Sequence, residues 1–152
     1  MNILVILCLI FSQDAITFPV HSYLVPAKMK SGWVTIEYEN PKCESLKEGS
    51  GEREFVIPES GYLCTSSSMY MGWAQRRYFV VDERGKRTPL KVKKQIWREA
   101  SFRTNESDCK VVAEEFFYGR KVTHENAILF DEKFLEEHPG CRNRGINTKL
   151  VP

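Results

Sequence analysis

The stretch that decides the fold is GWVTIEYE at residues 32–39, in which apolar and polar side chains alternate. Val34, Ile36 and Tyr38 fall on one face of this stretch, and its polar side chains fall on the other. Alternation with a period of two is typical of a β-strand that packs one face on a core. The sequence therefore predicts a strand here, and the Asn-Pro pair that follows ends it.

Similar short runs recur along the chain, separated by clusters of turn residues. The further predicted strands cover residues 53–57, 62–65, 77–81 and 111–118, with one or two more within residues 86–98. Polar composition makes the stretches 44–52 and 100–110 predicted loops. This succession of short strands and turns favours an all-β core.

The turns and the C-terminal region complete the fold prediction. Gly85 follows a polar triplet and suits the left-handed position of a hairpin. Residues 126–138 place apolar side chains at helical spacing and are followed by a Pro-Gly pair. The chain is predicted to be mainly β, either a β-sandwich or a small open β-barrel of six to seven short antiparallel strands with one C-terminal helix.

The N-terminus begins with an unbroken apolar run at residues 3–11. This run is too short to span a bilayer and is typical of the apolar part of a signal peptide. Small residues offer cleavage after Ser22, which we prefer, or after Thr17. The predicted organisation is a signal peptide at 1–22 and a single domain at 23–152, with a secreted or cell-envelope location. Retention of the run as a core strand is the alternative.

Cleavage would leave an even number of cysteines. These are Cys43, Cys64, Cys109 and Cys141. In an exported chain, four cysteines indicate two disulfides with three possible connectivities. Free thiols and a zinc site are the alternatives, and no CxxC spacing supports zinc. The positions of the cysteines along the predicted strands favour Cys43–Cys64 and Cys109–Cys141. Cys8 lies within the apolar run rather than at its end, so it is interpreted as an ordinary signal-peptide residue.

Charge and composition exclude several classes of protein. Lys and Arg number 22 and Asp and Glu number 20, so the formal net charge of +2 argues against a globally basic nucleic-acid-binding protein. Aromatic residues make up 12% of the chain, which is too many for a disordered tail. No apolar stretch reaches the roughly 20 residues of a membrane-spanning helix. We expect a monomer with no nucleic-acid partner and no transmembrane segment.

No motif predicts catalysis or cofactor binding. The P-loop, GxGxxG and HExxH patterns are absent from the sequence, and Ser66–Ser68 do not lie in a GxSxG turn. A hydrolase would need His124 or His138 beside a nucleophile. Glu114 and Glu115 are sequence neighbours and point to opposite faces of a strand. We therefore expect no catalytic residue, no cofactor and no metal.

The strongest local signal is a basic segment between residues 84 and 98, which contains no acidic residue. Its seven candidate partner-binding residues are Arg84, Lys86, Arg87, Lys91, Lys93, Lys94 and Arg98. Arg76 and Arg77 on the preceding strand could join them across the hairpin. The segment would suit an anionic cell-wall polymer, lipid headgroup or protein surface. The alternative is a solvated edge strand whose charges prevent aggregation.

The loop of residues 66–73 is a second candidate, because Trp73 lies there beside Met and Tyr residues. An exposed apolar loop would be a binding tip. We favour instead a loop whose aromatic side chains fold back over the core. The sequon at Asn105 has meaning only in a eukaryotic secretory pathway.

Four motifs in order suggest a relationship to known proteins. They are GWVxIxY from Gly32, FxIPExGxLxTSS from Phe55, YFxVDxxGxR from Tyr78 and EFFxG from Glu115. Together they resemble an uncharacterised family of small bacterial envelope proteins, often lipoproteins, over about residues 23–125. The resemblance implies location and fold rather than an activity. An anchoring cysteine is not recognisable, and the four domain cysteines are not part of the family pattern.

These observations favour an exported, non-enzymatic β-domain that binds another macromolecule of the envelope or extracellular space through the basic hairpin. The alternative is a secreted inhibitor or immunity-type protein that blocks a foreign enzyme with the loop Ser66–Trp73, which would need one dominant anchor residue. A small hydrolase is the third hypothesis.

Overall fold

The structure is a computed structural model that describes residues 18–29, 32–103, 109–119 and 136–141. Its elements, in chain order, are β1 Val20–Pro26, β2 Gly32–Tyr38, β3 Lys47–Gly49, β4 Glu52–Val56, β5 Tyr62–Cys64, β6 Gln75–Val81, β7 Arg87–Pro89, α1 Val92–Gln95, β8 Ile96–Arg103, β9 Val112–Tyr118 and the 3-10 turn η2 Pro139–Cys141.

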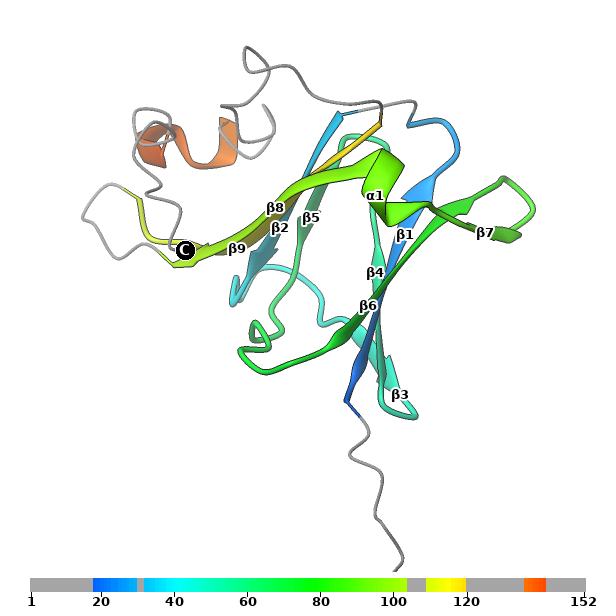
Figure 1. Ribbon diagram of the computed structural model, residues 1–152. Coiled ribbons are helices and arrows are strands. Elements are labelled where there is room, and N and C mark those ends of the chain that lie inside the picture. Colours follow the sequence, from blue (N-terminus) through cyan, green and yellow to red (C-terminus); the bar gives the residue numbers. More distant parts are fainter. Residues whose placement is uncertain (1–17, 30–31, 104–108, 120–135, 142–152) are drawn as a thin grey trace, which may run out of the picture.

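The strands form two mixed sheets that pack as a sandwich (Figure 1). The five-stranded sheet has the order β3-β4-β1-β6-β7, and the four-stranded sheet has the order β5-β2-β9-β8. The predicted mainly-β fold is confirmed. The purely antiparallel pairing was wrong, because β1 runs parallel to β4 and β6, and β2 runs parallel to β5. The described residues also hold nine strands rather than six or seven.

An aromatic stack packs β1 against both of its neighbouring strands. The register places Tyr23 opposite both Phe55 and Tyr78. The Tyr23 ring stacks on each of these rings, with centroids 4.7 Å apart in both pairs. Phe116 of the other sheet meets the Tyr23 ring edge-on at 5.5 Å. Such pairs add to the free energy of burial, so this stack fixes both the strand register and the contact between the sheets.

Strand β1 begins ahead of the boundary that we preferred for the signal peptide. Ser22 is fully buried and His21 is nearly so. A cut after Ser22 would fall inside this strand, whereas a cut after Thr17 would precede it. The start of β1 could not be predicted from the sequence, because His21 and Ser22 are polar and give no apolar alternation.

Strand β2 is buried on both faces. Val34, Ile36 and Tyr38 lie in the core between the sheets, as the alternation predicts. Thr35 and Glu37 on the opposite face are buried as well. The residues around η2 and Cys109 come over this outer face, and Cys109 and Cys141 form a second buried cluster with Tyr62.

Several local predictions can be compared with the structure. Gly85 has a φ of 79°, which confirms the hairpin between β6 and β7. The predicted loops 44–52 and 100–110 were wrong in part. Residues 47–49 form β3, and β8 continues to Arg103 because it pairs with β9. The predicted helix at 126–138 lies largely outside the described residues, which resume at 136.

Both predicted disulfides are present. One bond joins Cys43 to Cys64 and the other joins Cys109 to Cys141. The first connects the turn after β2 to β5, and the second connects the start of the β9 region to η2.

Candidate functional site

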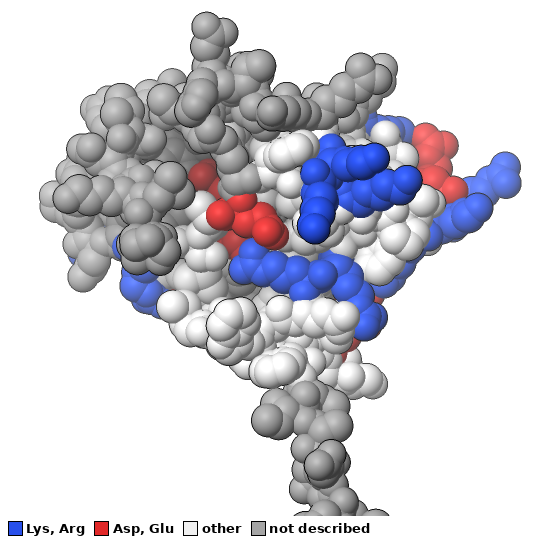
Figure 2. Space-filling view, in the orientation of Figure 1, with Lys and Arg blue, Asp and Glu red and all other residues white. Residues whose placement is uncertain are grey.

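The predicted basic segment lies at one edge of the five-stranded sheet. Arg84 and Lys86 are in the β6–β7 hairpin, and Lys91, Lys93 and Lys94 are at α1. We call these five residues the basic corner. All five are exposed. Figure 2 shows Lys and Arg side chains over the region where Figure 1 places α1, β7 and the hairpin.

The other predicted basic residues are distributed differently. Arg87 on β7 forms an ion pair with Glu54 at 2.6 Å, so its charge is neutralised. Arg76 forms ion pairs with Glu99 at 3.2 Å and Glu114 at 3.1 Å, which engages it away from the basic corner. The side chain of Arg98 lies outside the described part of the chain. Among the described residues, the basic corner makes no ion pair.

The loop before β6 is exposed at its end, contrary to the prediction that it folds over the core. Trp73 is 84% exposed and Met71 is 80% exposed. Phe18, which precedes β1, is 54% exposed. Met71 and Trp73, which lie two positions apart in this loop, form what we call the apolar tip. A shallow hollow of about 560 Å³ borders it, lined by residues 71–74 together with Arg76 and Glu99.

Tyr70 packs against the backbone of this loop and is itself 43% exposed. The Tyr70 ring lies so close to Gly72 that a Cβ there would meet the Tyr70 Oη at 2.5 Å. Tyr70 in turn contacts the ring of His21 edge-on at 5.6 Å. Burial, helped by the nearby charges of Arg53 and Arg76, lowers the pKa of His21 to about 4. A neutral His21 therefore supports the loop from inside.

A polar network lies in the interior between the sheets. Glu114 accepts hydrogen bonds from the Tyr23 hydroxyl at 2.7 Å and the Tyr38 hydroxyl at 2.9 Å. The guanidinium of Arg76 completes the partners of this buried carboxylate. Burial and the charge of Glu114 raise the pKa of both tyrosines, so both hydroxyls stay protonated and donate. Every group has a partner, so the network is structural.

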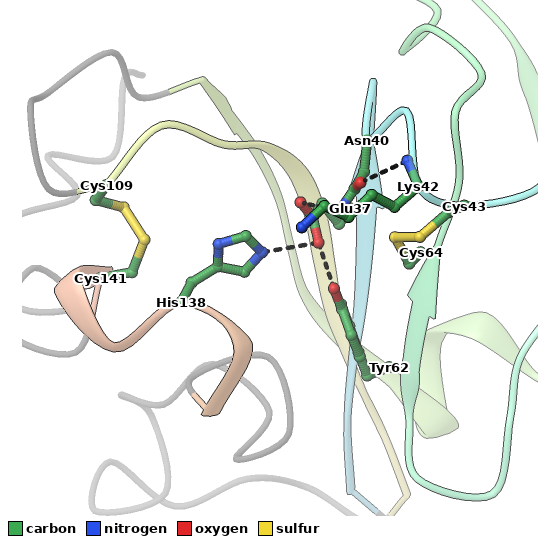
Figure 3. A network of polar contacts seen from close by, with 9 residues as sticks. All are labelled: Glu37, Asn40, Lys42, Cys43, Tyr62, Cys64, Cys109, His138 and Cys141. Carbon is green, nitrogen blue, oxygen red and sulfur yellow. Dashed lines mark hydrogen bonds and ion pairs between the residues drawn. A yellow bond between two sulfur atoms is a disulfide. The ribbon is translucent and has the colours of Figure 1, made fainter.

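A second network lies on the outer face of β2, between the two disulfides (Figure 3). The carboxylate of Glu37 lies 2.9 Å from Nε2 of His138. It also accepts hydrogen bonds from the Tyr62 hydroxyl and, at 3.1 Å, from the side-chain amide of Asn40. His138 is one of the two histidines that a hydrolase would need beside a nucleophile. Here it contacts a buried carboxylate and holds η2 on the sheet.

Nothing in the described part of the chain points to catalysis. Ser67 uses its hydroxyl to accept a hydrogen bond from the amide of Leu46, as expected of a loop residue. His124 lies outside the described residues. The described His, Cys, Asp and Glu side chains contain no group of three that could hold a metal ion. Of the helices described, none has the length and apolar character to cross a membrane.

Fold and sites together define a small, disulfide-linked β-sandwich domain with two exposed surfaces of different chemistry. The chain belongs to a family of unknown function, DUF6843, which it matches over residues 20–127. The resemblance to an uncharacterised family is thereby confirmed.

A solved structure shares the fold. It is the crystal structure of a "Putative Lipoprotein from Bacillus anthracis", with a TM-score of 0.64 and 17% sequence identity. The similarity covers 86% of this chain and 99% of that one. No curated protein matches the sequence. At this level of identity the similarity establishes the fold alone.

Proposed function

We propose that this protein is an exported, non-catalytic domain that binds an anionic polymer outside the cytoplasm through the basic corner. The observation that carries the proposal is the concentration, between Arg84 and Lys94, of exposed positive charge without ion-pair partners among the described residues. Arg53, Arg76, Arg87 and Arg103 all form ion pairs with acidic residues. The five charges of the basic corner have no such partner among the described residues, so they remain available to an external anion.

Protection of the sheet edge explains only part of this charge. Strand β7 is the edge of its sheet, and its three exposed residues include Pro89, which already limits pairing with another strand. Lys91, Lys93 and Lys94 lie at α1, a helical turn that presents no strand edge. Their like charges repel one another without helping to block β7. An anionic ligand would offset that repulsion.

The location outside the cytoplasm is supported by two features. Disulfides persist in oxidising compartments, and this domain has two of them. The apolar run at residues 3–11 suits a signal peptide. We place cleavage after Thr17 rather than after Ser22, because the earlier cut keeps the residues of β1 that pair with β4 and β6.

The test is binding to immobilised polyphosphate. Changing Lys91, Lys93 and Lys94 to Gln should weaken binding at low salt, and the difference should shrink as salt rises. Thermal stability should barely change, because exposed charges contribute little to folding. The matched control changes three other exposed lysines, Lys42, Lys47 and Lys110, to Gln. Equal binding by the two triple variants would refute a specific role for the basic corner.

A further inference from the structure

The two disulfides differ in how far solvent reaches them. Cys109 is 2% exposed and Cys141 is fully buried, whereas Cys43 and Cys64 are both half-buried. A thiolate must reach a sulfur atom before it can exchange with a disulfide, so access is a condition of the reaction. Of the two bonds, Cys43–Cys64 alone meets this condition in the folded domain.

A shallow hollow borders the accessible bond. It has a volume of about 380 Å³, and Cys43 and Cys64 form part of its wall. Apolar side chains line it as well, namely Leu46, Leu63 and Val56, of which the last is 57% exposed. A hollow of this size accepts a small molecule. Contact with these side chains would hold the carbon chain of a small thiol beside the two sulfur atoms.

The charged side chains of the hollow nearly balance one another. Glu54 is paired with Arg87 at 2.6 Å, so its charge is neutralised. Glu44 and Lys47 carry opposite charges, and both residues are exposed. The hollow therefore carries little net charge, and reversing the charge at Lys47 should make it discriminate between anionic and cationic thiols.

Opening the bond would leave the surrounding chain in place. The carbonyl of Glu44, next to Cys43, accepts a hydrogen bond from the Thr65 hydroxyl at 2.8 Å. The backbone amide of Leu46 donates to the Ser67 hydroxyl at 2.9 Å. These hydrogen bonds tie the two segments together independently of the sulfur atoms. Exchange at this disulfide is therefore compatible with a folded domain.

We propose that the Cys43–Cys64 bond is a site of thiol–disulfide exchange, at which a low-molecular-weight thiol forms a mixed disulfide with the domain. The thiolate of that molecule attacks one of the two sulfurs, and a new sulfur–sulfur bond forms. The other cysteine leaves as a thiolate and takes a proton from water. A second thiol then attacks the mixed disulfide, which gives two cysteine thiols and the oxidised dimer of the small thiol. The two electrons that reduce the domain thus come from two thiol molecules.

Differential labelling of the cysteines tests the proposal. Free thiols of the full chain are blocked with N-ethylmaleimide, and the folded protein is incubated with mercaptoethanesulfonate. New thiols are then trapped with iodoacetamide, and the peptides are mapped by mass spectrometry. We expect Cys43 and Cys64 to be labelled, or to carry the added thiol, at least about tenfold faster than Cys109 and Cys141, because access limits the reaction. In urea, which unfolds the domain, this difference should disappear.

A reversal of charge tests whether the thiol enters through the hollow. Lys47→Glu should slow exchange with the anionic mercaptoethanesulfonate about threefold, and should accelerate exchange with the cationic cysteamine by a similar factor. The matched control is Lys110→Glu, which makes the same change at an exposed lysine outside the hollow. It should leave both rates at Cys43–Cys64 unchanged.

Three results would overturn the proposal. The first is equal protection of the two disulfides in the folded protein, or earlier opening of Cys109–Cys141. The second is an equal effect of Lys47→Glu and Lys110→Glu, since the thiol would then not enter through the hollow. The third is loss of the β-sheet circular dichroism spectrum when Cys43–Cys64 opens, since this bond would then be purely structural.

Discussion

Two buried glutamates lie on opposite faces of the four-stranded sheet, and they are held in different ways. Glu114 on β9 lies opposite Ile36 and points into the space between the sheets. Glu37 on β2 lies opposite Ala113 and points to the outer face. Tyrosine hydroxyls donate to both carboxylates. The partners of Glu114 belong to strands, whereas Glu37 also depends on His138, in the segment that ends at Cys141.

The difference shows that a glutamate can be buried in two ways. The sandwich itself encloses Glu114, so its environment forms with the core. A disulfide-linked segment encloses Glu37, so its environment depends on the Cys109–Cys141 bond. We therefore expect the surroundings of Glu114, the inner site, to stay intact after changes that expose Glu37, the outer site, to water. Four experiments test this contrast.

The largest effect should follow from removing the outer disulfide. Replacing Cys109 and Cys141 by Ser should lower the free energy of unfolding by about 4 kcal/mol, as the chain-entropy account gives for a loop of this length. The sequence separation is 32 residues, compared with 21 for Cys43–Cys64. Urea unfolding measures the loss. A decrease smaller than that for the Cys43→Ser, Cys64→Ser variant would contradict the entropic reason.

Removing the inner carboxylate should come next. Glu114→Ala leaves two tyrosine hydroxyls and Arg76 without their buried partner, and should cost about 3 kcal/mol. Glu114→Gln keeps an oxygen that accepts a hydrogen bond and should cost less. Urea unfolding of both variants checks the order. The loss should be the same whether or not the Cys109–Cys141 bond is present, because the two sites are on opposite faces.

The third effect is a pH dependence of the inner region. The pKa of His21 is lowered to about 4 by burial, then by Arg53 and Arg76, so folding favours the neutral ring. The stabilisation is present above the ordinary pKa of about 6.5 and declines as pH falls toward 4. Between pH 6.5 and pH 5 the loss should be about 1.5 kcal/mol. His21→Phe should remove this part of the pH profile, measured by urea unfolding. An unchanged profile would mean that His21 is not the titrating group.

The smallest effect should come from the outer carboxylate. Glu37→Gln should cost about 1 kcal/mol, since the amide oxygen still accepts from Tyr62 while the contact with His138 weakens. In the variant that lacks the Cys109–Cys141 bond, this cost should shrink because His138 is no longer held in place. A double-mutant cycle measures the coupling. Strict additivity would show that the outer network forms without the disulfide.

The parts of the fold that the sequence predicts are local. The alternation at residues 32–39 predicted β2, and Gly85 predicted the hairpin. Strand β1 could not be predicted in the same way, because His21 and Ser22 are polar and their burial depends on strands far along the chain. Burial of Glu37 likewise depends on His138, about a hundred positions later.

The candidate surfaces also divide into features that the local sequence predicts and features that depend on distant parts of the chain. The basic segment could be found from the sequence alone, because a run of basic residues is visible without knowledge of the fold. The pairing of Arg87 with Glu54 could not be foreseen, since it requires β7 and β4 to come close in the folded sheet. Exposure of Trp73 could not be foreseen either, because it depends on how the loop before β6 lies on the folded sheet. The nearby glycine alone could have suggested a tightly packed loop.

The central position of β1 has a consequence for the order in which the chain can fold. This strand is synthesised before its neighbours, and Tyr23 pairs with Phe55 and with Tyr78, which follow 32 and 55 positions later. Until β6 is complete, β1 lacks one of its two partners, and closing such long connections slows folding. The first strand of the domain to be synthesised therefore cannot complete its packing until the chain has been made as far as β6.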